Sequence, residues 1–434
     1  MKPIKLNIQP SFLDGYIYLG MLFLISHNGE ICSISMEKLI AKLERDNPNH
    51  INFLRLAFLR NEWLNNKQSK LIFNNPNFFS SLKAIWKETS NLELNIRLED
   101  EEITKHHEVP SMPIFDFKSY GMKLFLGHRD GLHEFHINSN ENEFKSLKKP
   151  EKIFDNRSTF LSAKSGELMI SSNSDGLFRG SFQGINQNVK VSDRVLSPKS
   201  IRTGWSSYDV LNYTDQSNFN YFENKIKKPE KSAQRINRYS QEDETSDKTR
   251  IEEFGVKSYS IEELLKADIM NNNPSKRSRA NNPHFIQTIN SDEIEFSFNT
   301  NGFCFFVLKD GRIITVHLSK NIINKSLKFG KIYSELSINL KEQSFGNIIS
   351  SSILPGGCVL ELFDVVMVIQ NDKYSIIEDE PTLNVKTFPS SKRFRNLVLT
   401  FKDDSFSIHS TFPIDLNYLF EDSLETNNID NFPF

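Results

Sequence analysis

The chain has 434 residues, of which 38% are hydrophobic and 25% are charged, and its formal net charge is −2. This composition is typical of a globular protein with room for a large core. The small net charge provides no overall field that would favour nucleic acid or an anionic membrane surface.

The cysteine spacing and the first residues of the chain indicate the cellular compartment. Cys32, Cys304 and Cys358 are far apart and follow no CxxC spacing, which argues against a disulfide framework or a zinc site. The opening MKPIKLNIQPSFLDG contains no apolar signal-peptide segment. The longest early apolar run, residues 16–25, is too short to span a bilayer. We therefore expect a cytoplasmic protein that binds no membrane.

The first predicted element is an alternating strand over residues 4–8. We expect it to pair with the last strands of the chain, because such pairing closes a ring of sheets and removes an open edge.

A hairpin pattern then recurs seven times along the chain. An apolar run ends in a turn centred on Asp or Asn, and a second run follows. Tight turns need positive φ, which Asn, Asp and Gly tolerate, and four of these turns carry Asn-Gly or Asp-Gly. The turns centre on Asn28, Asp130, Asp175, Asp215, Asp310, Asp372 and Asp403.

Residues 36–90, between the first two hairpins, have helical periodicity. Ser35 is placed to cap a first helix, which Asn47-Pro48 ends. Residues 51–63 are apolar on nearly every side, so this helix must be buried by the chain or by a partner. Asn75-Pro76 opens a third helix. Its predicted apolar face contains Phe78, Phe79, Leu82, Ile85 and Trp86. A strand over residues 92–98 follows.

The stretch 224–284 separates the fourth and fifth hairpins. It is poor in apolar residues, and a basic run is directly followed by an acidic one, so no core offsets the entropy of ordering. We expect a long flexible loop with one short helix over 261–270, because Ser260 and Glu263 have capping-box spacing. After the last hairpin, residues 421–434 form an acidic tail.

Hairpins repeated in this way predict an all-β fold, a β-propeller of about seven blades. Two adjacent turn spacings lie near the ~40–45 residues of a propeller blade, and the two insertions account for the long gaps. The propeller is assigned to residues 1–35, 91–223 and 285–420, with the helical insertion 36–90 in the first blade. Two packed β-sandwich domains are the alternative.

The hairpin series resembles the WD40-like class of seven-bladed propellers outside the two insertions. The resemblance is topological only: no Trp-Asp dipeptide occurs, and Gly127-His128 matches that family's Gly-His pair once. Gly356-Gly357 is similar to the kelch glycine pair, also once. The resemblance implies a rigid platform for other proteins, and it allows no functional residue to be carried over.

No catalytic, metal or cofactor site is predicted. His128, His133 and His136 flank one turn, but no carboxylate or Cys completes a metal site there. Five acids are assigned backbone roles in turns, and the alternative is that they act at the mouth of a central channel. They are Asp14, Asp130, Asp175, Asp310 and Asp403. The sequence lacks GxSxG, P-loop, GxGxxG-to-helix and HExxH motifs.

We predict a non-enzymatic scaffold or regulatory subunit of an intracellular complex, which binds another protein. Aromatic side chains anchor protein interfaces, and the insertion offers four candidates: Phe58, Trp63, Phe79 and Trp86. The alternative is that these helices pack on one another and on the propeller. The flexible loop is predicted to be a docking segment or a protease-sensitive switch. Its candidate residues are Lys227, Lys228, Arg235, Arg238, Leu264 and Leu265.

Two other functions stay open. A hydrolase or lyase with its site in the central channel predicts carboxylates at the channel mouth. A nucleic-acid-binding component of a bacterial signalling or antiviral-defence complex would use the basic run of the loop, but the adjacent acidic run competes for the same charges.

Overall fold

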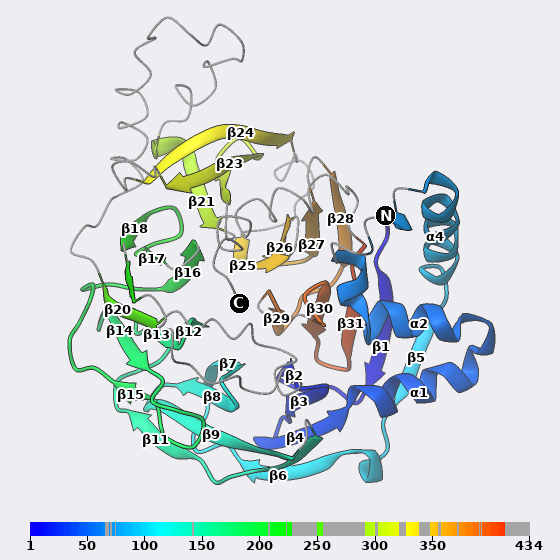
Figure 1. Cartoon of the computed structure of the whole chain (residues 1–434), viewed down its shortest axis with the longest axis horizontal. Helices are drawn as coiled ribbons and strands as arrows, with labels where there is room; N and C mark the ends of the chain where they lie inside the picture. Colours follow the sequence, from blue (N-terminus) through cyan, green and yellow to red (C-terminus); the bar gives the residue numbers. More distant parts are fainter. Residues whose placement is uncertain are drawn as a thin grey trace, which may run out of the picture.

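Seven sheets of three to five strands surround a central axis in the computed structural model of the protein (Figure 1). The structure describes residues 1–412 apart from two long segments, 228–249 and 255–290, and shorter gaps. The shorter gaps are 66–68, 70–71, 74, 141–142, 207–208, 223, 300–302, 321–326, 338–347, 355–356, 371–372, 390 and 392.

Blades 1 to 4 follow one another along the chain, and each begins at the axis. Blade 1 consists of β2 (Asp14–Tyr18), β3 (Met21–Ile25), β4 (Glu30–Ser35) and β6 (Thr104–Glu108). Blade 2 consists of β7 (Ile114–Tyr120), β8 (Lys123–His128), β9 (Gly131–Asn140), β10 (Glu143–Leu147) and β11 (Glu151–Phe154). Blade 3 consists of β12 (Phe160–Lys164), β13 (Glu167–Ser171), β14 (Leu177–Ser181) and β15 (Lys190–Val191). Blade 4 consists of β16 (Arg202–Ser206), β17 (Asp209–Tyr213) and β18 (Phe219–Phe222).

Blades 5 and 6 have the same up-and-down order, and blade 7 combines strands from both ends of the described chain. Blade 5 consists of β21 (Ile294–Asn299), β22 (Phe303–Leu308), β23 (Arg312–Lys320) and β24 (Leu327–Ser337). Blade 6 consists of β25 (Ile348–Leu354), β26 (Gly357–Leu362), β27 (Val366–Gln370) and β28 (Lys373–Glu378). Blade 7 consists of β29 (Asn384–Thr387), β30 (Leu397–Phe401), β31 (Phe406–Ser410), β1 (Ile4–Gln9) and β5 (Leu94–Arg97).

The first strands of the seven blades form a closed ring at the axis. Contacts join β2 to β7, β7 to β12, β12 to β16, β16 to β21, β21 to β25, β25 to β29, and β29 back to β2. The predicted propeller is therefore confirmed, with seven blades, and the alternative of two β-sandwich domains is wrong.

Blade 7 closes the ring. Strand β1 pairs antiparallel with β31, with Ile4 opposite Ser410 and Ile8 opposite Phe406. Strand β5 then pairs parallel with β1 and covers its outer edge. The expected pairing of residues 4–8 with the last strands is confirmed, because β1 supplies an alternating buried face to the unfinished sheet.

Six of the seven predicted turns join the second and third strands of a blade. Gly29 and Gly131, for example, have φ of +86° and +140°, as their tight turns require. Blade 6 differs, because its corresponding turn is at Asp364 and the predicted turn at Asp372 lies one strand later. Residues 371–372 are themselves outside the described residues.

The helical insertion lies between β4 and β6, and its helices cover the outer side of β1 and β5 (Figure 1). The Ser35 hydroxyl accepts a hydrogen bond from the Lys38 amide, and Asn75 caps the last helix in the same way. The segment predicted as one helix over 51–63 is two, because the α-helix ends at Phe58 and a 3-10 turn follows. The elements are α1 (Met36–Asp46), η1 (Pro48–His50), α2 (Ile51–Phe58), η2 (Asn61–Asn65) and α4 (Pro76–Thr89).

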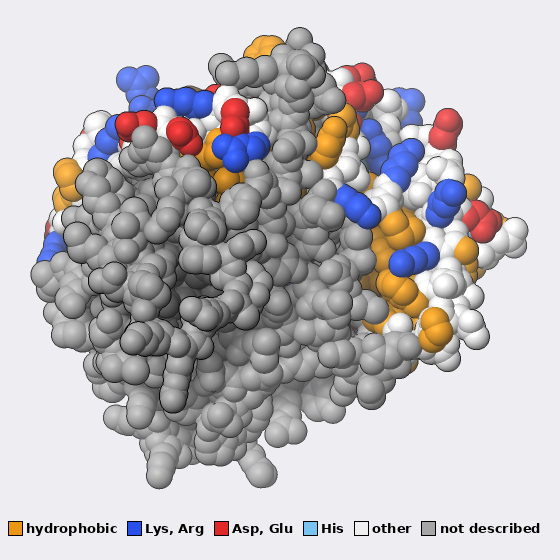
Figure 2. Space-filling view, turned by 90° about the horizontal axis from the view of Figure 1, so that it is seen from above, with side chains coloured by type: hydrophobic (Ala, Val, Ile, Leu, Met, Phe, Trp, Pro, Cys, Tyr) orange, Lys and Arg blue, Asp and Glu red, His pale blue; other side chains and the backbone are white. Residues whose placement is uncertain are grey.

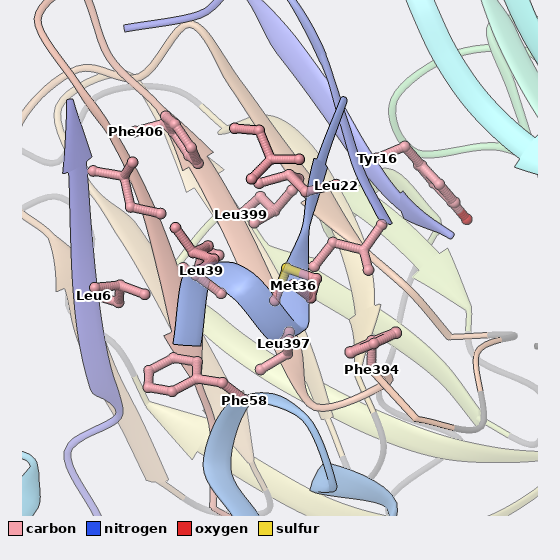
Figure 3. Packing of buried hydrophobic residues seen from close by; sticks show 14 of the residues in the cluster. Leu6, Tyr16, Leu22, Met36, Leu39, Phe58, Phe394, Leu397, Leu399 and Phe406 are labelled. Carbon is pink, nitrogen blue, oxygen red and sulfur yellow. The ribbon is translucent and has the colours of Figure 1, made fainter. Parts of the chain in front are cut away.

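One hydrophobic cluster joins this insertion to blades 7 and 1. Figure 3 shows side chains from α1 and α2 among those of β1, β3 and β30. The labelled members on these elements are Met36, Leu39, Phe58, Leu6, Leu22, Leu397 and Leu399. The helices therefore bury their apolar stripes on the flank of the propeller, directly over the closure.

The second predicted insertion is described only in part. Strands β19 (Asn224–Lys227) and β20 (Arg250–Phe254) form a two-stranded antiparallel sheet where the sequence predicted only loop. Lys227 ends β19. The remaining switch candidates, the helix predicted over 261–270 and the acidic tail 421–434 lie outside the described residues. Those candidates are Lys228, Arg235, Arg238, Leu264 and Leu265. Within the described ranges, no helix combines the length and the apolar character needed to cross a membrane.

The insertion core generates a stability prediction. Trp86 is 0% exposed, and its indole Nε1 donates a hydrogen bond to the Lys2 carbonyl at 3.0 Å. We expect Trp86→Ala to lower the free energy of unfolding by about 3–5 kcal/mol, because it leaves a cavity and an unpaired carbonyl. Urea titration followed by circular dichroism measures this.

Trp63→Ala is the matched control. Trp63 lies in the same insertion but is 46% exposed, so its truncation should cost less than about 1 kcal/mol. Equal losses for the two variants would contradict the packing described.

Candidate functional site

A charged network lies at the central axis and joins four blades. Lys386 of β29 places Nζ 3.2 Å from Asp14 Oδ2 of β2 and 2.7 Å from Asp116 Oδ1 of β7. The other carboxylate oxygen of Asp116 accepts a hydrogen bond from the Leu161 amide of β12, and Lys118 Nζ donates to the Leu161 carbonyl. One ammonium group thus pairs with two carboxylates from neighbouring blades.

This network corrects the role assigned to Asp14. Asp14 is the first residue of β2 and only 3% exposed, so it does not lie in a turn. Its Oδ1 accepts a hydrogen bond from the Gly15 amide at 2.7 Å. The sequence pattern grouped Asp14 with the turn aspartates, but Asp14 begins a buried inner strand.

The two carboxyl groups differ in proton affinity. Burial raises the pKa of Asp14 to about 6, against the opposing charge of Lys386. Burial also acts to raise the pKa of Asp116, but Lys386 and Lys118 together hold it below its ordinary value. A pair of acids with separated pKa values is typical of catalytic sites, and it also arises in buried ion-pair networks.

A second cation holds the opposite side of the ring. Arg202 of β16 donates to the Ser351 hydroxyl of β25 at 3.0 Å and to the Ser297 carbonyl of β21. Its guanidinium carbon lies 4.2 Å from the ring centroids of both Tyr213 and Phe296. Burial lowers the pKa of Arg202 to about 10. Blades 4, 5 and 6 are therefore joined through one side chain.

The histidines around the Asp130 turn do not converge on one point. His128 and His133 are stacked, with Nε2 of the first 2.5 Å from Nδ1 of the second. His136 instead contacts Glu134 at 2.8 Å and Asn188 at 2.7 Å. Among the residues that the structure describes, no three His, Cys, Asp or Glu side chains gather as a metal site would require.

The four aromatic residues predicted to bind a partner occupy different environments. Phe58 and Trp86 are both 0% exposed, so their prediction as partner contacts is corrected: they are core residues of the insertion. Phe79 is half-buried against the core. Trp63, at 46% exposure, is accessible to a partner.

Other apolar residues of the insertion are exposed and were not predicted as contacts. Phe78 and Ile85 are 45% and 41% exposed and lie seven residues apart, on one side of the buried stripe of α4. Ile51 and Ile72 are also exposed. Figure 2 shows apolar side chains with Lys and Arg among them at the right of the molecule, where α4 lies in Figure 1. We call Ile51, Trp63, Ile72, Phe78 and Ile85 the insertion surface.

No protein-family model matches the sequence, and no curated protein is significantly similar to it. Among solved structures, the β-propeller domain of Cps50 (Swd1) from Myceliophteria thermophila is similar at a TM-score of 0.46. Its sequence identity is 8%, over 94% of this chain and 100% of that one. YCF48 bound to D1 peptide is similar over 95% of this chain and 97% of that one, with 8% identity and a TM-score of 0.42.

A third similar structure is the extracellular domain of a protein described as a hybrid two-component system of B. thetaiotaomicron. It shares 9% identity over 93% of this chain at a TM-score of 0.44, and this chain spans 41% of its length. These similarities concern the fold alone, and the closed ring of seven sheets identifies the propeller independently of them.

The raised pKa of Asp14 generates a prediction on pH. Because its folded pKa of about 6 exceeds the ordinary value of 3.8, the folded state binds the proton more tightly. This contribution to stability is complete below the unfolded pKa and is lost as pH rises through 6. We expect Asp14→Asn, relative to the unaltered protein, to gain about 1 kcal/mol between pH 5 and pH 7.5.

Urea titrations of both proteins at the two pH values measure this difference. Asp175→Asn is the control, since Asp175 lies exposed in a hairpin turn, and its difference from the unaltered protein should not change with pH. A pH-independent difference for Asp14→Asn as well would show that Lys386 keeps Asp14 ionised.

Proposed function

We propose that this protein is a non-enzymatic interaction platform, which acts in an intracellular complex and binds another protein through the insertion surface. The observation that carries the proposal is the exposure of Trp63, Phe78 and Ile85 on helices whose opposite faces are locked into the propeller core. Exposed large apolar side chains on one inserted segment are a feature of protein-binding surfaces.

The rigidity of the support favours tight binding. Trp86 of α4 contacts Phe53 of α2, with ring centroids 5.8 Å apart, and its indole is tied to the strand β1 region through Lys2. A surface held in this way loses little conformational freedom when a partner binds, so more of the contact energy appears as affinity.

The charged network of the channel supports a role without chemistry of its own. Asp14 and Asp116 are 3% and 8% exposed, and both bond the same lysine. A general acid or base must reach its substrate within hydrogen-bond distance, and a buried carboxylate held by an ammonium group is poorly placed to do so. In this proposal the network fixes the blades.

Regulation through residues 224–284 stays a prediction. Apart from β19 and β20, this segment lies outside the described residues. Its role as a docking segment or protease-sensitive switch is therefore proposed from its charge pattern alone.

The test uses a partner that is first identified by affinity purification and then prepared in pure form. We expect the double variant Trp63→Ala/Ile85→Ala to weaken binding by a factor of about 30, since truncating interface anchors costs about 2 kcal/mol or more. Isothermal titration calorimetry with the purified partner gives the dissociation constants.

Phe363→Ala is the matched control. Phe363 is 62% exposed in the turn between β26 and β27 of blade 6, away from the insertion. Affinity lost only in this variant would refute the insertion surface as the binding site. Affinity unchanged in both would move the search to the propeller faces.

A further inference from the structure

A row of aromatic rings runs from the core of the insertion to its surface. Trp86 lies 4.8 Å from Phe412, which in turn lies 6.2 Å from Phe79. Phe73 continues the row, with centroid distances of 6.1 Å to Phe79 and 6.3 Å to Phe78. The row ends in solvent, because Phe78 is 45% exposed.

Phe412 is the last residue of the chain that the structure describes, and it is 2% exposed within this row. The chain therefore continues into residues 413–434 from a point in contact with α4. Helix α4 has 14 residues, a length of about 21 Å. Residues 413–434 are long enough to run along the whole helix, since an extended chain covers about 3.3 Å per residue.

The composition of residues 413–434 is complementary to the surface of α4 beside Phe412. The segment contains five acidic and no basic side chains, together with apolar residues that include Leu416, Leu419, Phe420 and Leu424. On α4, Lys83 and Lys87 are exposed, and Lys83 Nζ lies 4.1 Å from the Phe79 ring centroid. We call Ile72, Phe73, Phe78, Phe79 and Lys83 the α4 edge.

The neighbourhood of the α4 edge is positively charged. Burial lowers the pKa of the Met1 amino group, and the nearby charges of Lys373 and Lys83 lower it further. Three cationic groups from the N-terminus, α4 and β28 thus lie close enough to repel one another. An acidic segment would relieve this repulsion, while Glu88 on α4 lies 3.8 Å from His50 toward the other end of the helix.

We propose that the α4 edge is the docking surface of the protein's own residues 413–434. The apolar side chains of the segment cover the exposed rings, and its carboxylates face Lys83 and Lys87. Tethering at Phe412 makes the contact intramolecular, with an effective concentration in the millimolar range. A modest intrinsic affinity is therefore sufficient. Ile72 and Phe78 also belong to the insertion surface, so the segment and the proposed partner would compete for these two residues. The test below uses the isolated chain, so its outcome does not depend on the partner.

The test places a photo-crosslinking amino acid, p-benzoylphenylalanine, at position 78 of the full-length protein. Irradiation of the dilute monomer should give an intramolecular crosslink to residues 413–434, identified by peptide mass spectrometry, with a yield independent of protein concentration. Position 185 is the control, since Ile185 is an apolar residue that is 63% exposed between β14 and β15 of blade 3, outside the insertion.

Charge reversal supplies the second measurement. Lys83→Glu/Lys87→Glu in the position-78 protein should lower the crosslink yield by about fivefold, since two weak exposed attractions become repulsions, and added salt should lower it as well. Both side chains are exposed, so this variant keeps the fold.

Three outcomes would overturn the proposal. Equal yields from positions 78 and 185 would show contact without a defined surface. A yield that grows with protein concentration would assign the α4 edge to a second copy of the chain. If position 78 crosslinks efficiently to other residues but not to 413–434, the segment does not bind the α4 edge.

Discussion

The pairing of β1 with β31 is the constraint on which the rest of the structure depends. It joins residues 4–8 to residues 406–410, so the two ends of the described chain become neighbours in one sheet. Without β1, blade 7 would keep only β29, β30 and β31, and β31 would become an unpaired edge strand. The alternating face of β1 is buried completely at Ile4, Leu6 and Ile8. The hydrophobic effect thus holds the closure as much as the ladder of hydrogen bonds does.

The helical insertion belongs to this closure. It leaves blade 1 after β4 and returns through β5, which adds a parallel strand to blade 7 on the far side of β1. The helices then cover the joined sheets with the buried stripe of α1 and with Phe58 and Trp86. The helical insertion, which the sequence places outside the propeller repeat, therefore stabilises the pairing of β1 with β31.

At the axis, side chains join neighbouring blades. Strand ladders run within a blade, so among the described residues contacts between blades come mainly from side-chain packing and from polar side chains. Lys386 and Arg202 each connect three blades, and Asp116 extends the first group to a fourth. Buried ion pairs add little net stability, but a displaced partner leaves a costly uncompensated charge. We infer that Lys386, Arg202 and Asp116 fix the relative positions of the blades.

A surface built on this frame is preorganised. The aromatic row from Trp86 through Phe412, Phe79 and Phe73 to Phe78 connects the exposed residues to the core by direct ring contacts. Exposed side chains that rest on buried ones have few alternative positions, which suits them to recognition.

The sequence by itself determined the elements whose causes are local. Asn-Gly and Asp-Gly turns need positive φ, and Ser35 and Asn75 cap their helices through bonds to amides two or three residues away. Turn spacing then gave seven blades. The same local pattern did not tell which strand pair a turn joins, so Asp372 was assigned one strand too early in its blade.

Only the tertiary structure decided which residues are buried and which polar groups meet. Phe58 and Trp86 have the same chemistry as Trp63 and Phe78, and the packing of the helices on β1 and β30 separates them into core and surface. Asp14, Asp116 and Lys386 are distant in sequence and meet because the ring closes. Burial and long-range charge pairing depend on which surfaces come together, and local sequence patterns do not contain that information.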